Sequence, residues 1–466
     1  MLFSSIPFLY YFLPLILIAY FAVPKRLKTP VLLIGSLVFY AWGEPRYVLL
    51  MAVSILLGYV FGLLIEKYRG TVRGKVCTAL SVTVTLGFLL YFKYADFFIE
   101  SFNATTGLSV PLLHISLPIG ISFYTFQMLS YLIDVSRGTA AAQRNLLRLA
   151  TYIAMFPQLI AGPIVRYSEI AQQLEHRSHT LEGAALGIRR FLIGLGKKVL
   201  IANTMGELCE TFLASTDPSI LYVWLYAAAF TLQIYYDFSG YSDMAIGLGH
   251  LFGFRFPENF DYPYVSGSIT EFWRRWHMTL GGWFRDYLYI PLGGNRVPKA
   301  RWLLNILIVW VATGLWHGAA WNFVVWGLLF ALLLMIEKLW LLPVLKKAKV
   351  FSHLYTLFFV VVSFVIFNAQ SLPHAGEHLA AMFGLGGLPF ASAEGLFYLR
   401  NYAIVLVLAA VGTTPLLRNA VVMLRKKTVL QRTINVLEPI ALSAVLLVVT
   451  ACLVNGSFNP FLYFRF

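Results

Sequence analysis

The sequence predicts an all-α, polytopic membrane protein, and three observations lead to that prediction. Hydrophobic residues make up 59% of the 466 residues and charged residues only 12%, whereas soluble domains carry about 25% charged residues. Mean hydropathy is +0.73. Apolar runs of roughly 20 residues, the length that crosses a bilayer, recur along the whole chain. We therefore expect one integral-membrane domain over residues 1–466, with about 11–12 transmembrane helices and additional re-entrant and interfacial helices.

The expected spans are the apolar runs that lie between short basic loops. They are 6–23, 30–43, 47–65, 77–94, 112–133, 191–213, 219–236, 303–317, 319–337, 353–369, 400–417 and 437–455. The basic clusters lie at 25–28, 67–75, 137–148, 189–198, 274–301, 338–348 and 418–432. Because cytoplasmic loops carry an excess of Lys and Arg, this alternation predicts that both termini are external. The first run is followed, not preceded, by basic residues, so we expect an uncleaved span and not a signal peptide.

The charge and the cysteines exclude several classes of protein. The net charge of +15, from 36 basic and 21 acidic residues, is explained by a membrane-lipid surface, and no nucleic-acid partner is expected. The three cysteines are scattered and show no metal-binding or disulfide spacing. Phosphate-binding loops, dinucleotide fingerprints and serine-hydrolase elbows are absent from the sequence. We expect no metal and no tightly bound cofactor.

Two segments are too irregular to be simple spans. Residues 150–165 are apolar but contain Pro157, Gly162 and Pro163. Broken backbone at membrane depth is tolerated only inside protein or beside water, so a re-entrant or interfacial element is expected. Residues 255–301 interleave tryptophan and tyrosine with arginine, which predicts short helices at the cytoplasmic interface.

Two Trp-His dipeptides, at 276–277 and 316–317, place imidazoles in this apolar chain. His317 lies roughly 24 Å along a helix from Arg301, which is well into the bilayer. Ionisable residues at such depth are usually functional, and we interpret His317 as a general base that deprotonates a hydroxyl acceptor. The alternative is a buried histidine that is satisfied by a backbone carbonyl.

The neighbours of His317 favour a packed polar site. Thr313 shares its helical face and could orient the ring by a hydrogen bond. Gly314 and Gly318 would let a neighbouring helix approach closely. Asn322 could contribute a further polar group if the helix breaks near Gly318.

His277 is more ambiguous. Trp276 precedes it directly. If the segment is helical, Trp273 lies four residues earlier and Leu280 three residues later, so the ring would share an apolar face, and a packing role is as consistent with the sequence as catalysis. Arg274 and Arg275 could bind the phosphates of a cytosolic acyl-coenzyme A, because the guanidinium matches phosphate bidentately. The alternative for both arginines is ordinary positive-inside charge.

Two carboxylates close the segment 233–243. Asp237 could orient a histidine or pair with an arginine. Ser242 or Asp243 could cap a following helix, and capping at the interface is the simpler interpretation.

Taken in order, these segments resemble the membrane-bound O-acyltransferase (MBOAT) family, in its bacterial branch that is similar to the alginate O-acetylation protein. The resemblance covers nearly the whole chain. It is carried by Met1–Ser5, Pro118–Gln127, Phe156–Pro163, Asp237–Met244, Phe256–Tyr264, Glu271–His277, Trp283–Asn295, Gly314–Gly318 and Asn459–Phe466.

The resemblance implies an O-acyltransferase with a central tunnel and with its catalytic core over residues 118–326. His317 matches the principal catalytic histidine of the family, and His277 matches the second histidine. The resemblance further implies acetyl-coenzyme A as donor. It implies transfer, directly or through a partner extracytoplasmic acetyltransferase, to an exported polysaccharide at the bacterial plasma membrane.

Three other functions remain open. The enzyme could move D-alanine from a carrier protein to teichoic acid. The chain could be a transporter or flippase with a histidine proton relay, although transporters often show repeated halves and no repeat is visible. It could also be a structural subunit. The acceptor is not readable from the sequence: cellulose, another exopolysaccharide, peptidoglycan or a partner protein all fit.

Overall fold

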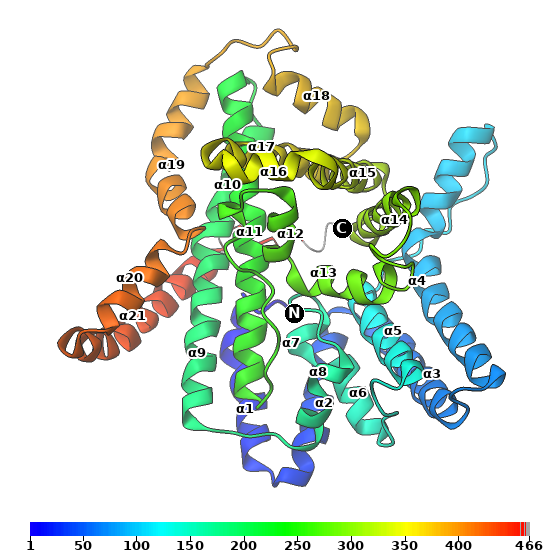
Figure 1. The fold of residues 1–466 in the computed structure, drawn as a ribbon. Coiled ribbons are helices and arrows are strands. Elements are labelled where there is room, and N and C mark those ends of the chain that lie inside the picture. Colours follow the sequence, from blue (N-terminus) through cyan, green and yellow to red (C-terminus); the bar gives the residue numbers. More distant parts are fainter. Residues whose placement is uncertain (457, 461, 463–466) are drawn as a thin grey trace. The chain divides into compact units, whose positions relative to one another are not determined.

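A computed structural model describes residues 1–456, 458–460 and 462, and in that part of the chain every regular element is a helix (Figure 1). The predicted all-α class is therefore confirmed. Residues 461 and 463–466, which belong to the C-terminal motif Asn459–Phe466, lie outside the described residues. The chain folds as two compact units, Met1–Phe191 with Ser242–Pro257 and Leu192–Tyr241 with Glu258–Phe466.

The first unit consists of helices that are joined by turns and by longer connections, of which residues 107–120 form one. Its elements are η1 (Pro7–Phe12), α1 (Leu13–Ala22), α2 (Lys28–Gly43), α3 (Val48–Lys67), α4 (Val72–Thr106), α5 (Ile121–Arg137), α6 (Leu146–Ala154), α7 (Phe156–Leu159), α8 (Tyr167–Glu175) and most of α9 (Leu181–Gly196). The last third of α11 (Ile220–Leu251) also belongs to it.

The second unit carries both Trp-His dipeptides. Its elements are η4 (Lys197–Ala202), α10 (Asn203–Leu213), the first part of α11, α12 (Ile269–Arg275), α13 (Met278–Phe284), η6 (Arg285–Tyr289), α14 (Lys299–His317), α15 (Trp321–Ile336), η7 (Glu337–Leu341), α16 (Leu342–Lys347), α17 (Lys349–Asn368), α18 (Leu372–Met382), α19 (Ala393–Gly412), α20 (Leu416–Arg425) and α21 (Thr428–Val454). The predicted short helices of 255–301 are thus α12, α13 and the π-helical turn η6.

The protein is a multi-pass membrane protein. Six helical stretches of the described residues are long and apolar enough to cross a bilayer: Pro45–Lys67, Val72–Thr106, Trp321–Lys347, Lys349–Asn368, Ala393–Gly412 and Thr428–Val454. The predicted run 191–213 lies within the consecutive helices α9, η4 and α10, and the run 219–236 falls largely within the 32-residue helix α11. The prediction for 112–133 is wrong at its start, because helix α5 begins only at Ile121. Pro118, which lacks a backbone donor, shortly precedes it.

The proline-broken segment 150–165 is buried in protein. Every residue from Thr151 to Val165 is buried. The Phe156 N–H donates to Ser36 Oγ at 3.2 Å, and Tyr152 Oη donates to the Val165 carbonyl at 3.0 Å. Side chains thus satisfy backbone groups that no regular helix pairs, as irregular backbone away from water requires.

Ser242 and Asp243 do not cap a helix, and that expectation is wrong. Both residues lie inside α11, which continues to Leu251. Asp243 instead accepts hydrogen bonds from Arg190 Nε and Nη2 at 3.0 and 2.9 Å. The polar residues at the end of the apolar run resembled a helix start, but an ion pair with α9 lets the helix continue.

Helices α14 and α15 form a hairpin with very close backbones (Figure 1). A Cβ atom at Gly314 would lie 2.3 Å from the carbonyl oxygen of Phe323, and one at Gly327 would lie 2.4 Å from that of Trp310. At Gly318 it would lie 2.1 Å from the Phe323 ring. The predicted close approach at Gly314 and Gly318 is confirmed. The hairpin turn directly follows His317.

Candidate active site

His317 is the last residue of α14 and is buried. Its ring lies among aromatic side chains from three helices. The ring centroids of Trp316, Trp326 and Phe367 lie 5.0, 5.1 and 5.3 Å from that of the imidazole. Helices α14, α15 and α17 together therefore fix the position of this histidine in an apolar setting.

The two polar neighbours that were expected to serve His317 have other partners. The Thr313 hydroxyl donates its proton to the Val309 carbonyl at 2.7 Å. Asn322 Nδ2 donates to the carbonyls of Phe367 and Ala369 at 3.2 and 3.0 Å, so it satisfies the end of α17. Asn322 thus joins the start of α15 to the end of α17, a supporting role near the histidine.

His277 occupies the tight corner between α12 and α13. It is buried and has φ of +44°, a left-handed conformation that is uncommon outside glycine. Its Nδ1 lies 3.0 Å from Asn259 Oδ1, while Nε2 has no hydrogen-bond partner in the part of the chain that the structure describes. Burial, and secondarily the charge of His317, lower the pKa of His277 well below its usual value. The ring therefore stays neutral near pH 7.

Trp316 lies close to both histidines. The centroid of the Trp316 ring is 5.9 Å from that of the His277 ring and 5.0 Å from that of the His317 ring. The topology expected from the sequence separated one histidine at the interface from the other deep in the bilayer. The structure instead brings both imidazoles into one aromatic cluster.

A cavity of about 530 Å³, which we call the apolar cavity, runs beside α14. Its walls include Trp273, Trp310 and the α14 positions from Ile306 to Thr313. Thr313 is one helical turn before His317. Three cationic residues also line it: Arg274, Arg285 and Lys338. The cavity therefore combines positive charge with an apolar wall that includes the residue one turn before the histidine.

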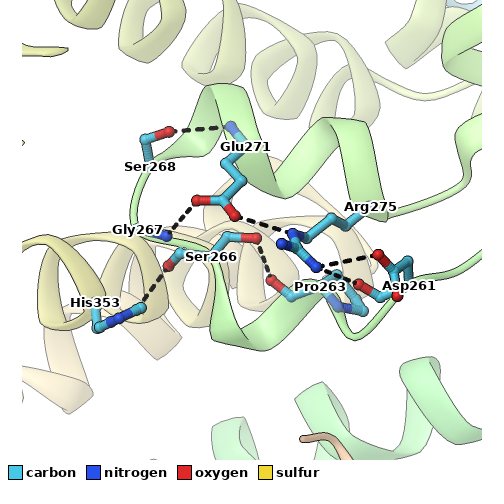
Figure 2. A network of polar contacts seen from close by, with 8 residues as sticks. All are labelled: Asp261, Pro263, Ser266, Gly267, Ser268, Glu271, Arg275 and His353. Atoms are coloured by element: carbon cyan, nitrogen blue, oxygen red, sulfur yellow. Dashed lines mark hydrogen bonds and ion pairs between the residues drawn. The ribbon is translucent and has the colours of Figure 1, made fainter. Parts of the chain in front are cut away.

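A second cavity of about 790 Å³, which we call the polar cavity, adjoins α12 and α17. Figure 2 shows a polar network beside it, formed by Asp261, Pro263, Ser266, Gly267, Ser268, Glu271, Arg275 and His353, and all of these except Pro263 and Ser266 line the cavity. Arg275 Nε donates to Glu271 Oε1 at 3.0 Å, and its Nη1 donates to Asp261 Oδ2 at 3.1 Å. Two carboxylates therefore neutralise Arg275, whose role is to hold this wall together.

Arg274 differs from its neighbour Arg275. It is exposed, lines both cavities and forms no ion pair or hydrogen bond with any described residue. Lys346 and Lys349 line the polar cavity beside it. The sequence pointed to both arginines equally, but Arg275 is paired with two carboxylates, whereas Arg274 has no such partner among the described residues.

The tryptophans of the first Trp-His segment pack α12 against its surroundings. Trp273 meets the rings of Trp310 and Phe330 edge to face, at 4.6 and 4.9 Å. Trp276 stacks on Phe272 at 5.5 Å. Both tryptophans therefore support the site by fixing α12, and Trp273 also forms part of the cavity wall.

Asp237 pairs neither with a histidine nor with an arginine, contrary to expectation. Its Oδ1 lies 2.8 Å from Lys198 Nζ, and both side chains are almost completely buried. Its Oδ2 accepts the Leu462 N–H at 3.0 Å. Lys198 lies in a basic cluster that we assigned to a cytoplasmic loop, which is why its buried pairing was missed.

Glu337 is a second residue whose role was not predicted from the sequence. Its side chain is fully buried. Oε1 accepts the Ile269 N–H at 2.6 Å, and Oε2 accepts the Thr270 N–H and hydroxyl at 2.8 and 2.6 Å. The carboxylate thus satisfies the first turn of α12. An acid at the end of the run 319–337 was the signal that could have found it.

The chemistry available is that of imidazole in an apolar setting. No group of three potential metal ligands among His, Cys, Asp and Glu occurs within residues 1–456, 458–460 and 462. The site offers two buried histidines and a cavity whose lining includes Thr313, one helical turn before His317. At that cavity, Arg274 forms no ion pair with any described residue. These features suit general base catalysis on a substrate that carries negative charge.

Comparisons with known proteins agree with this arrangement. The chain is 45% identical over 392 residues to the probable alginate O-acetylase AlgI of Azotobacter vinelandii, covering 83% of this chain and 79% of that protein. It is 41% identical to the protein of the same name from Pseudomonas putida over the full length of both. The peptidoglycan O-acetyltransferase of Helicobacter pylori is 34% identical, over 83% of this chain and 81% of that protein.

The family profile named MBOAT, membrane-bound O-acyltransferase family, matches residues 37–373, which include both Trp-His dipeptides, both cavities and the α14–α15 hairpin. The chain is therefore an acyltransferase and belongs to the membrane-bound O-acyltransferase family.

Proposed function

We propose that this protein transfers an acetyl group from cytosolic acetyl-coenzyme A to a hydroxyl group on the other side of the membrane. The acceptor is an exported polysaccharide, reached directly or through a partner extracytoplasmic acetyltransferase. The observation that carries the proposal is the apolar cavity, which has an unpaired arginine in its wall and reaches Thr313, one turn before His317.

The two cavities suit the two halves of such a donor. Arg274, Lys346 and Lys349 supply uncompensated positive charge for the phosphates of coenzyme A. The less polar pantetheine arm suits the apolar cavity between Trp273 and Trp310. This arrangement would present the thioester near the end of α14, where the histidine lies.

The reaction needs one proton to move. His317 takes the proton of the acceptor hydroxyl while the hydroxyl oxygen attacks the thioester carbonyl carbon. The tetrahedral intermediate collapses, the carbon–sulfur bond breaks, and the leaving thiolate receives the proton from His317. His277 supplies a second imidazole close to Trp316, and its Nε2, which has no hydrogen-bond partner among the described residues, accepts a hydrogen bond from the bound acceptor. No metal or resident cofactor takes part.

Membrane placement follows from charge. Helix α14 begins with Lys299 and Arg301, and cytoplasmic loops are enriched in such residues. We propose that this end faces the cytoplasm of a bacterial plasma membrane, that both termini are external, and that residues 118–326 form the catalytic core around a tunnel. The donor and the acceptor would then reach His317 from opposite sides.

The nature of the acceptor is suggested by the relatives. Two are named for acetylation of alginate and one for acetylation of peptidoglycan. Both are carbohydrate polymers that lie outside the plasma membrane and carry free hydroxyl groups. We therefore propose a carbohydrate polymer as the acceptor class.

The reaction is tested with the purified full chain in lipid nanodiscs and acetyl-coenzyme A that is labelled in the acetyl group. Alginate oligosaccharides and peptidoglycan fragments serve as acceptors. We expect label transfer, and we expect His317→Ala to lower turnover by about 10²–10⁴-fold. His374→Ala, on α18, is the matched control and should retain activity. Undiminished transfer by His317→Ala protein that is folded would remove this histidine from the mechanism.

The same preparation separates the alternatives. Transfer from a D-alanyl carrier protein, with none from acetyl-coenzyme A, would show the teichoic acid type of reaction. Uptake of label into proteoliposomes without any covalent product would show a transporter. Either result contradicts the proposal.

A further inference from the structure

Asn259 forms several hydrogen bonds with the corner that holds His277. The residue is buried. Its Oδ1 accepts the Thr279 hydroxyl at 2.8 Å and the Thr279 N–H at 3.4 Å, and it lies 3.0 Å from His277 Nδ1. Its backbone carbonyl accepts the Met278 N–H at 3.0 Å. One asparagine thus holds the consecutive residues 277–279.

The contacts settle which end of the amide faces the histidine. A backbone N–H can only donate, so the atom that it approaches must be the carbonyl oxygen of the Asn259 side chain. An amide oxygen can only accept. His277 Nδ1 must therefore carry a proton, which it donates to that oxygen.

A proton on Nδ1 defines the state of the other ring nitrogen. In a neutral imidazole one nitrogen is a donor and the other an acceptor. Nε2 of His277 then presents a lone pair, and it has no hydrogen-bond partner among the described residues. The left-handed backbone at His277 adds strain that the surrounding contacts must offset, a feature that often marks functional residues.

We propose that Asn259 is a positioning residue that locks His277 in the Nδ1–H tautomer, so that Nε2 accepts a hydrogen bond from a neighbouring hydroxyl of the acceptor while His317 takes the proton of the attacking hydroxyl. The inference rests on the proposed acyl transfer and adds a specific role for a residue outside both Trp-His dipeptides. Asn259 itself contacts no reacting atom.

An amide suits this task better than a carboxylate would. A carboxylate at the same place would stabilise the imidazolium and keep the ring protonated. The groups that face His277 are Phe238 from α11, Thr279 from α13, and Trp316 and His317 from α14. The other imidazole is the titratable one among them, and its charge also opposes protonation. A neutral partner thus leaves Nε2 of the His277 ring able to accept a hydrogen bond.

The test uses two variants and two readouts on the full chain in nanodiscs. Nitrogen-15 NMR of labelled histidine reports the tautomer directly, without any need for activity. We expect wild-type protein to show the Nδ1–H form at His277, assigned by its loss in His277→Gln. Asn259→Ala should show a mixture of tautomers and a kcat about 10²-fold lower, with little change in the KM for acetyl-coenzyme A.

Asn259→Asp keeps the hydrogen bond but adds a negative charge. It should move the acid limb of the pH–rate profile to higher pH by roughly 1–2 units. Asn305→Ala is the matched control: Asn305 is also buried and donates to the Leu292 and Gly294 carbonyls. It should lower thermal stability without moving the pH profile or the tautomer.

A single tautomer in Asn259→Ala, or an unshifted profile in active Asn259→Asp, would overturn the proposal. If wild-type protein transfers no acetyl group at all, the proposed function fails, and the NMR readout still decides the tautomer question.

Discussion

Gly314 offers a quantitative test of how the α14–α15 hairpin supports the site. A methyl group at this position would lie 2.3 Å from the Phe323 carbonyl oxygen and 3.1 Å from its carbon. Both atoms belong to the backbone of α15, so no side-chain rotation can relieve the contact. The helices would have to separate by about 1 Å to restore normal packing distances.

Two opposing terms set the effect of Gly314→Ala on stability. Alanine gains about 1 kcal/mol of helix propensity over glycine. Overpacking of a close contact costs about 1–3 kcal/mol. We expect the cost of overpacking to exceed the gain in helix propensity, because the α15 backbone cannot move aside easily. The net loss of stability should be modest. The effect on activity should be larger: His317 follows three residues later, and a displacement of about 1 Å can lower turnover about 10²-fold.

Gly87→Ala is the control for this prediction. Gly87 lies inside α4, and a Cβ atom there would meet nothing within 4 Å. Thermal unfolding followed by tryptophan fluorescence, together with turnover of labelled acetyl-coenzyme A, should be measured for both variants in the same detergent. Gly87→Ala should match or exceed wild-type stability. If Gly314→Ala behaves in the same way in both measurements, the geometric reasoning is refuted.

Three further predictions concern charged residues in the second unit. Arg274→Ala should raise the KM for acetyl-coenzyme A about tenfold at unchanged melting temperature. Arg275→Ala should instead lower the melting temperature, because it releases two carboxylates. Titration calorimetry and thermal unfolding distinguish the two variants, and equal effects of both would contradict the distinction. Glu337→Gln should destabilise the protein by about 1–3 kcal/mol, since it replaces charge-assisted hydrogen bonds to the start of α12, and unchanged chemical denaturation would argue against that role. Asp237→Asn leaves Lys198 without its buried counter-ion, which should cost about 3–5 kcal/mol; wild-type stability would show that the pair is not closed in solution.

The sequence was most informative where one physical constraint acts alone. Apolar length predicted the helices on either side of Gly318, and the spacing of small residues predicted their close packing. The structure confirms both, with α14 ending at His317 and α15 beginning at Trp321. Burial of the broken segment 150–165 follows from the same kind of argument, because prolines exclude a regular helix and lipid excludes unpaired backbone.

The sequence was least informative about which side chains meet. Arg274 and Arg275 are chemically identical neighbours, and only the position of Asp261 and Glu271 in space separates their roles. Asp237 lies next to residues that suggest an interface, yet its partner is a lysine from η4. Such pairings depend on the relative positions of distant segments, which no local pattern in the sequence encodes.

The proximity of the two histidines has a consequence for proton transfer. The Trp316 ring lies close to both, and both are buried, so a positive charge on one imidazole raises the free energy of charging the other. The pair can therefore hold one added proton far more easily than two. The proposed acyl transfer from a thioester to a hydroxyl also involves a single proton, because one proton leaves the hydroxyl and one reaches the thiolate. A site with one easily protonated position and a second, neutral acceptor beside it can bind a neighbouring hydroxyl of the acceptor with one ring while the other takes the proton of the attacking hydroxyl.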